Sequence, residues 1–175
     1  AVYVFYPGSF GVQFVRQWRQ SGLSGKIPLL STSTVDGINL PALQDAAVGV
    51  GDGSFWGPEM DNPASKRFVQ EFEAKYKRVP SQYAAAAYDS AQLLDSAIAR
   101  VKGNVGDKKA FMAALKAADF SSIRGSFKFN NNNFGIQDFY LLEVVKDSRG
   151  RYTHKTGPKI MPAMMDAYHT RCPMK

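Results

Sequence analysis

The sequence predicts an α/β fold built on a parallel sheet. In the first third of the chain, short apolar runs alternate with segments of helical periodicity, in the order strand, helix, strand, helix, strand. This alternation is typical of parallel strands joined by crossover helices. A length of 175 residues, 45% of them hydrophobic, is enough for one domain with a core. No stretch approaches the roughly 18 consecutive apolar residues of a membrane span.

The elements of the first third follow from local patterns. Three buried strands are predicted at AVYVFY (1–6), KIPLLS (26–31) and AAVGV (46–50). A helix is expected over 12–22, with Gly22 at its C-terminal end, and a short helix over 40–46. Because Ala1 opens directly in a strand with no leader before it, we expect a mature chain or a fragment that begins inside a fold.

The remainder predicts helices followed by strands. Three helices are expected over 62–78, 82–101 and 108–118. Phe68, Phe72 and Tyr76 form an apolar stripe on the first, and Ser81 and Asp107 can cap the other two. The predicted strands are GSFKF (125–129), DFYLLEVV (138–145) and RYTHKT (151–156), separated by turns at 130–135 and 146–150.

The glycine-rich stretch GVGDGSFWGPEMDNP (49–63) does not match a nucleotide site. The fingerprint G-x-G-x-x-G fails because Ser54 stands where the third glycine belongs. No Gly-Lys-Ser/Thr triplet is present, and WGPEMD intervenes before the next helix, whereas a phosphate loop opens directly into one. The stretch therefore has another role.

Composition disfavours several further classes. From residue 146 onward seven basic residues, the last of them Lys175, stand against two acidic ones, so this tail holds five of the seven excess positive charges. They surround turn signals, which is typical of a solvated surface and not of a nucleic-acid interface. Cys172 is either a free thiol or has its partner in a missing part of the chain. His154 and His169 lack a second ligand at metal spacing, and we interpret both as surface residues. The esterase pattern G-x-S-x-G is absent.

Four stretches together resemble the type I periplasmic solute-binding proteins of ABC importers, in the branch that binds leucine, isoleucine, valine, amides and aromatic acids. They are VYVFYPGSFGVQFVRQWRQSGL, IPLLSTSTVDG, FWGPEMDNPASKRFVQEFEAKYKRVPSQYAAAAYDSAQLL and IRGSFKFNNNNFGIQDFYLLEVV. The resemblance extends along the whole chain but covers only about the second half of the family's fold. It implies a two-lobed fold of parallel sheets, represented here by incomplete portions of both lobes.

The resemblance implies a division into four parts. Residues 1–56 correspond to a portion of the second lobe, 57–137 to a portion of the first, 138–157 to strands returning to the second, and 158–175 to a C-terminal extension. The expected partners are a small-molecule ligand, an ABC permease in the membrane and the missing N-terminal half of the same protein. The expected location is periplasmic or tethered outside the membrane. No catalytic step, cofactor, metal or nucleic acid is expected.

The resemblance also implies a ligand site at the C-terminal ends of the parallel strands, where loops present their side chains. Its candidate residues are Ser9, Phe10, Thr32, Ser33, Phe55, Trp56 and Tyr83. Ser33 matches the position where amino-acid-binding members place an acidic group against the ligand's ammonium. A serine cannot neutralise a buried cation. An amide, an aliphatic acid or an aromatic carboxylate is therefore favoured over a branched-chain amino acid.

Alternatives remain open for the residues and for the function. The aromatic candidates can be packing residues, and the two hydroxyl side chains at 32–33 can cap the turn that follows them. The same fold can serve as a ligand-sensing receptor domain. A hydrolase on a flavodoxin-like sheet is a weaker alternative.

Overall fold

The computed structural model describes residues 1–172 and shows an α/β molecule with a six-stranded sheet. Neighbouring strands follow the order β1–β2–β3–β5–β4, and β6 pairs with β5. The parallel strands are β1 (Val2–Val4), β2 (Leu29–Ser31) and β3 (Gly51–Ser54). The antiparallel ones are β4 (Lys128–Phe129), β5 (Gly135–Lys146) and β6 (Tyr152–Met164). The predicted α/β class and the parallel order of the first three strands are confirmed. The sheet continues from β3 with β5, which pairs with it in antiparallel orientation.

Helices connect the strands as crossover segments. The connections between the parallel strands hold α1 (Ser9–Gln20), then α2 (Leu40–Leu43) with the 3-10 helix η1 (Gln44–Ala47). Between β3 and β4 come α3 (Pro63–Tyr76), α4 (Gln82–Arg100) and α5 (Lys108–Ala117). The side chains of Ser81 and Asp107 accept hydrogen bonds from the backbone N–H groups of Ala84 and Ala110, as their N-cap positions predict. These two predicted caps are confirmed.

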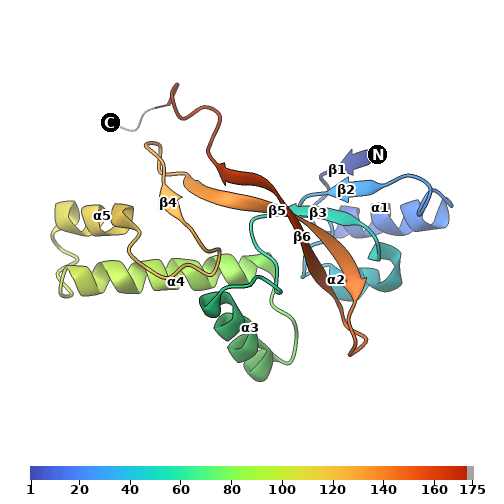
Figure 1. Ribbon diagram of the computed structural model, residues 1–175, viewed down its shortest axis with the longest axis horizontal. Coiled ribbons are helices and arrows are strands. Elements are labelled where there is room, and N and C mark those ends of the chain that lie inside the picture. Colours follow the sequence, from blue (N-terminus) through green and yellow to red (C-terminus); the bar gives the residue numbers. More distant parts are fainter. Residues whose placement is uncertain (173–175) are drawn as a thin grey trace.

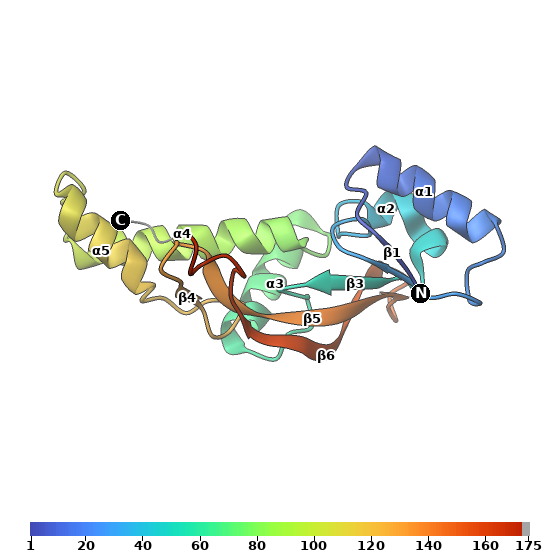
Figure 2. The ribbon, with the colours of Figure 1, turned by 90° about the horizontal axis from the view of Figure 1, so that it is seen from above.

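The molecule is elongated, with different helices at its two ends. Both views place α1 and α2 at one end and α4 and α5 at the other (Figures 1 and 2). The β5–β6 pair crosses the middle of the molecule between them (Figure 1). Three register irregularities between Gln137 and Leu142 bend this pair along its length.

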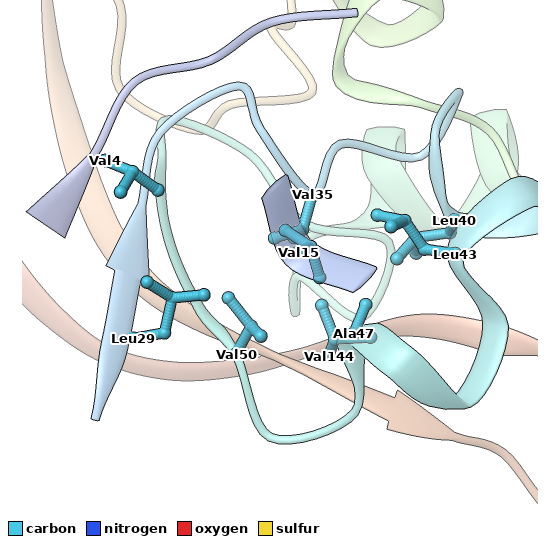
Figure 3. Packing of buried hydrophobic residues seen from close by; sticks show 9 residues of the cluster. All are labelled: Val4, Val15, Leu29, Val35, Leu40, Leu43, Ala47, Val50 and Val144. Atoms are coloured by element: carbon cyan, nitrogen blue, oxygen red, sulfur yellow. The ribbon is translucent and has the colours of Figure 1, made fainter. Parts of the chain in front are cut away.

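The buried hydrophobic residues form two separate clusters. The first cluster contains nine buried residues from β1, α1, β2, α2, η1, β5 and their loops, all drawn in Figure 3. The second contains Trp56, Met60, Phe68, Ala85 and Ile123. Along the chain, the change from the first cluster to the second falls between Val50 and Trp56, and β5 contributes to both.

The third parallel strand begins five residues later than the sequence pattern indicates. Residues 46–50 form the end of η1 and a turn, and the strand is the glycine-containing segment Gly51–Ser54. The reason is space: a Cβ on Gly51 would lie 2.8 Å from Leu30 Cδ2 and 3.3 Å from Leu141 Cδ1. The glycines therefore allow close packing between neighbouring strands.

The C-terminal strand also departs from expectation. β6 continues to Met164, past the expected strand end at residue 156. His154 is only 6% exposed, so the interpretation of this residue as a surface histidine is wrong. His154 pairs with Val144 of β5, and this pairing between strands buries its side chain. The polar residues next to it in sequence gave no indication of this burial.

Candidate functional site

The candidate site lies at the C-terminal ends of the parallel strands, where the loops after β1, β2 and β3 meet. The backbone N–H of Tyr6 donates to Thr34 Oγ1 at 3.0 Å, which joins the first loop to the second. Thr32 Oγ1 donates to the carbonyl oxygen of Gly53 at 2.7 Å, which joins the second loop to β3. The first two loops and the end of β3 therefore form one hydrogen-bonded surface.

The start of α4 completes this surface through Gln82. Its Nε2 donates to Ser33 Oγ at 3.4 Å, and its Oε1 accepts from Ser54 Oγ at 3.3 Å. Gln82 thus bridges the loop after β2 and the end of β3. The backbones also approach closely, because a Cβ on Gly37 would lie 3.0 Å from the Cα of Ser81. Sequence reasoning missed Gln82; its only signal was its place between the cap Ser81 and Tyr83.

Ser33 has a special backbone conformation at the centre of this contact. Its φ is 57°, in the left-handed region that few residues other than glycine and asparagine adopt readily. The hydroxyl accepts the hydrogen bond from Gln82 instead of capping a helix, since α2 has Asn39 as its N-cap. The turn that follows is held by Asp36, whose carboxylate accepts from the N–H groups of Ile38 and Asn39.

Two acidic side chains lie near this surface but do not face solvent. Asp52 is fully buried, and Asp36 is 3% exposed. The pKa of Asp52 is raised to about 7, mainly by burial and to a lesser extent by the nearby Asp36, while a hydrogen bond from Ser31 Oγ at 2.9 Å opposes the shift. Burial also raises the pKa of Asp36. Neither carboxylate is exposed enough to receive the cationic group of a ligand at this surface.

Ser9 and Phe10 lie at the start of α1, beside an open groove. Both side chains are exposed, and Phe10 is 73% exposed. The groove has a volume of about 560 Å³. It is lined by Tyr6, Pro7, Phe10, Gln13, Phe14 and Gln17. The Tyr6 and Phe14 rings lie with centroids 5.5 Å apart, so the groove has an aromatic wall.

The two aromatic residues after β3 belong to the second hydrophobic cluster. Trp56 is 2% exposed, and its indole N–H donates to Ser65 Oγ at 2.9 Å. Its ring packs edge-on against Phe68, with centroids 5.7 Å apart. The indole therefore has no free face for a ligand, which corrects the expectation that Trp56 lines the cleft. Phe55 is partly buried, with the guanidinium of Arg124 4.4 Å from its ring centroid.

The predicted site residues thus fall into separate environments. Thr32 and Ser33 share the loop surface with Gln82, and Tyr83 follows on α4 with 46% of its surface exposed. Ser9 and Phe10 lie beside the α1 groove, whereas the aromatic pair at 55–56 packs into the second cluster. Within residues 1–172 no group of three or more metal-ligating side chains comes together. No helix of this part of the chain is long and apolar enough to cross a membrane.

Comparison with known proteins gave a family match and several similar structures. Residues 1–150 match the family model described as periplasmic binding protein. An ABC transporter substrate-binding protein from Sphaerobacter thermophilus is similar over 93% of this chain, with 28% identity and a TM-score of 0.85. A solute-binding protein of an ABC transporter from R. palustris, solved in complex with benzoate, is similar over 95% of this chain, with 32% identity and a TM-score of 0.82.

A more distant structure shares the fold alone. This is a leucine-binding protein from Thermotoga maritima, 22% identical over 87% of this chain, with a TM-score of 0.71. The chain spans less than half of each of these three proteins, 45%, 44% and 43% respectively. No curated protein of similar sequence was found.

Proposed function

This chain belongs to the periplasmic binding protein family, and from that premise we propose that it is part of the extracytoplasmic solute-binding component of an ABC importer. The observation that carries the proposal is the family match over residues 1–150 together with the loop surface at the ends of three parallel strands. This end of a parallel sheet is where α/β proteins bind ligands. A membrane permease is the proposed partner, and the preceding half of the protein is proposed to supply the rest of both lobes.

We further propose that the two clusters mark the two lobes. On this proposal residues 1–56 and 138–157 belong to the second lobe and 57–137 to the first, with 158–175 as an extension. The change of cluster between Val50 and Trp56 supports a crossing close to residue 56, because Trp56, the last residue of the second-lobe portion, already packs in the second cluster. Gln82 then carries a contact from the first-lobe portion to Ser33 and Ser54 of the second.

The proposed ligand is an aromatic carboxylate. The loop surface offers hydroxyl and amide groups at Ser33 and Gln82, and the two acidic residues near it are buried. An ammonium group placed here would lack a counter-charge, which is costly in a closed cleft. The relative solved with benzoate supports the same class. Aromatic groups such as Phe10 and Tyr83 can provide stacking surfaces, since both are exposed.

The proposed mechanism is lobe closure without a catalytic step. A ligand that contacts both lobes favours the closed arrangement by its differential affinity for that state. The hydrogen bonds of Gln82 to Ser33 and Ser54 are contacts of this kind within the chain itself. The closed form is proposed to dock on the permease.

The test is calorimetric titration of the full-length protein with benzoate, 4-hydroxybenzoate and leucine, in the wild type and in Ser33→Asp. Benzoate is expected to bind the wild type. The variant is expected to lose at least about tenfold in benzoate affinity, equivalent to about 1.4 kcal/mol, because a carboxylate at this position repels the ligand's own. Aspartate tolerates the left-handed backbone of Ser33, so the substitution adds little strain.

The matched control is Gln70→Glu, which adds the same charge at an exposed position on α3. It should leave benzoate affinity within a factor of two. Leucine binding to the wild type without benzoate binding would overturn the proposed ligand class. Equal loss of affinity in both variants would show that net charge, and not Ser33, governs binding.

A further inference from the structure

We propose that a second pocket, distinct from the loop surface, binds inorganic phosphate or a phosphate monoester. This basic pocket has a volume of about 260 Å³ and lies between α2, the α3–α4 connection and the start of β6. The residues that line it include Leu40, Lys77, Arg78, Pro80, Arg151 and His154. The proposal does not depend on which solute the loop surface binds.

The charges around the basic pocket leave positive groups without counter-charges. Arg151 is neutralised, because its guanidinium lies 3.0 Å from Glu73 and 2.8 Å from Asp147. Lys77 and Arg78 are both exposed, and neither forms an ion pair within residues 1–172. Two unpaired cations in consecutive positions at the mouth of a pocket favour an anionic occupant.

A buried histidine with an unpartnered ring nitrogen is among the residues that line the same pocket. His154 is 6% exposed, and its Nε2 has no hydrogen-bond partner among the described residues. Leaving a buried polar atom unpaired is unfavourable, so native structures usually pair such atoms with protein groups, water or a ligand. His154 therefore supplies a second observation, independent of the surface charges, that points to a bound polar molecule.

The chemistry of this imidazole selects phosphate among anions. Burial lowers the pKa of His154 to about 4, against the opposing effect of a backbone hydrogen bond with Val35, so the ring is neutral at physiological pH. Nε2 of a neutral ring is either a donor or an acceptor according to the tautomer. Hydrogen phosphate matches both cases, because it carries anionic oxygens as acceptors and a hydroxyl as donor. Sulfate carries no hydroxyl at this pH and can match only the donor case.

The basic pocket lies between the two hydrophobic clusters, and its lining residues come from both sides. Leu40 belongs to the first cluster, whereas Lys77 and Arg78 follow α3, whose Phe68 belongs to the second. In Figure 1 the connection from α3 to α4 passes through the middle of the molecule, between the two ends. A phosphate group bound here contacts residues from both sides of this junction.

The test is calorimetric titration of the full-length protein at neutral pH with inorganic phosphate, glycerol 3-phosphate and sulfate. Phosphate is expected to bind more tightly than sulfate, and comparison with glycerol 3-phosphate distinguishes the free ion from a monoester. The double variant K77Q/R78Q is expected to lose at least about tenfold in phosphate affinity. His154→Phe is expected to lose a similar factor through removal of Nε2.

The matched control is K108Q/K109Q, which removes two consecutive exposed lysines at the start of α5. This control should bind phosphate as the wild type does. If His154→Phe does not fold, the exposed pair at 77–78 decides the question alone. Absence of phosphate binding at millimolar concentration, or equal loss in both double variants, overturns the proposal. Because benzoate binding is measured separately, failure here leaves the proposed solute-binding function standing.

Discussion

At the scale of single residues, two buried titratable side chains give the protein opposing pH dependences. Asp52 has a pKa raised by burial to about 7, and His154 has one lowered by burial to about 4. A raised carboxyl pKa adds stability at low pH that is lost as the pH rises toward 7. A lowered imidazole pKa adds stability at neutral pH that is lost as the pH falls from 6.5 toward 4. Between about pH 4 and 6.5 the two effects oppose each other.

Removing one group should therefore reveal the other. In Asp52→Asn the free energy of unfolding is expected to rise with pH between 4 and 6.5, because the unfolded His154 binds a proton that the folded one excludes. In His154→Phe it is expected to fall between 4 and 7, because the folded Asp52 keeps its proton. The limiting slope is about 1.4 kcal/mol per pH unit in each case. Urea denaturation at pH 4.5, 5.5 and 6.5 measures these slopes.

The control for this prediction is Asp95→Asn, which removes an exposed carboxylate on α4. Its slope should equal that of the wild type. Parallel curves for all four proteins would mean that the buried pair does not govern the pH dependence.

At the scale of an element, α1 is positioned by one glycine in its first turn. Gly11 is buried, and a Cβ there would lie 1.9 Å from the carbonyl oxygen of Tyr6 and 3.0 Å from Thr34 Cγ2. The same Tyr6 donates its backbone N–H to Thr34 Oγ1. The helix start, the loop after β1 and the loop after β2 therefore share one contact, which fixes where Phe10 stands.

Gly11→Ala is expected to destabilise the protein, although alanine is the better helix former. The gain in helix propensity is about 1 kcal/mol, whereas overpacking against backbone typically costs about 1–3 kcal/mol or more, and at 1.9 Å the backbone must move. The free energy of unfolding from urea denaturation measures the net effect. Gly106→Ala is the matched control, because its Cβ would meet only Asn104 Oδ1 at 3.5 Å. A Gly11→Ala protein as stable as this control would refute the close contact.

The same scale shows which elements the sequence could predict. The helices α3, α4 and α5 could be predicted because periodicity and caps are local, as at Ser81 and Asp107. The third strand could not be located, because glycine is needed at Gly51 to fit between the side chains of Leu30 and Leu141, which are distant in sequence. Local patterns favoured the more apolar residues 46–50 instead.

The candidate site was predictable only in part, for a related reason. Thr32 and Ser33 could be assigned to the loop after the second strand because strand ends and loop positions follow from the order of elements. Gln82 could not, since its role depends on α4 reaching a loop 49 positions earlier in the chain. Burial of Trp56 likewise depends on Ser65 and Phe68 of α3, so its aromatic character alone could not distinguish packing from ligand contact.

At the scale of the whole molecule, the end formed by α4 and α5 has large apolar side chains that are exposed. On α4 and α5, Leu94 is 47% exposed, Ile98 41% and Met112 52%. The similar structures are about twice the length of this chain, since it covers 43–47% of each one compared. On the proposed function, the preceding half of the protein packs against this apolar face of α4 and α5.

The double variant L94E/I98E should then have opposite effects on two forms of the protein. In residues 1–175 expressed alone, it should reduce self-association and binding of a hydrophobic dye, because exposed apolar area drives both. In the full-length protein it should lower the free energy of unfolding by at least about 3 kcal/mol, because two charges enter a packed interface.

Gln92→Glu, at an exposed position on the same helix, is the control and should change neither form. Sedimentation and dye fluorescence report on the short chain, and urea denaturation reports on the long one. If the full-length protein tolerates both glutamates, this face is not covered by the preceding half, and the proposed completion of the first lobe is wrong.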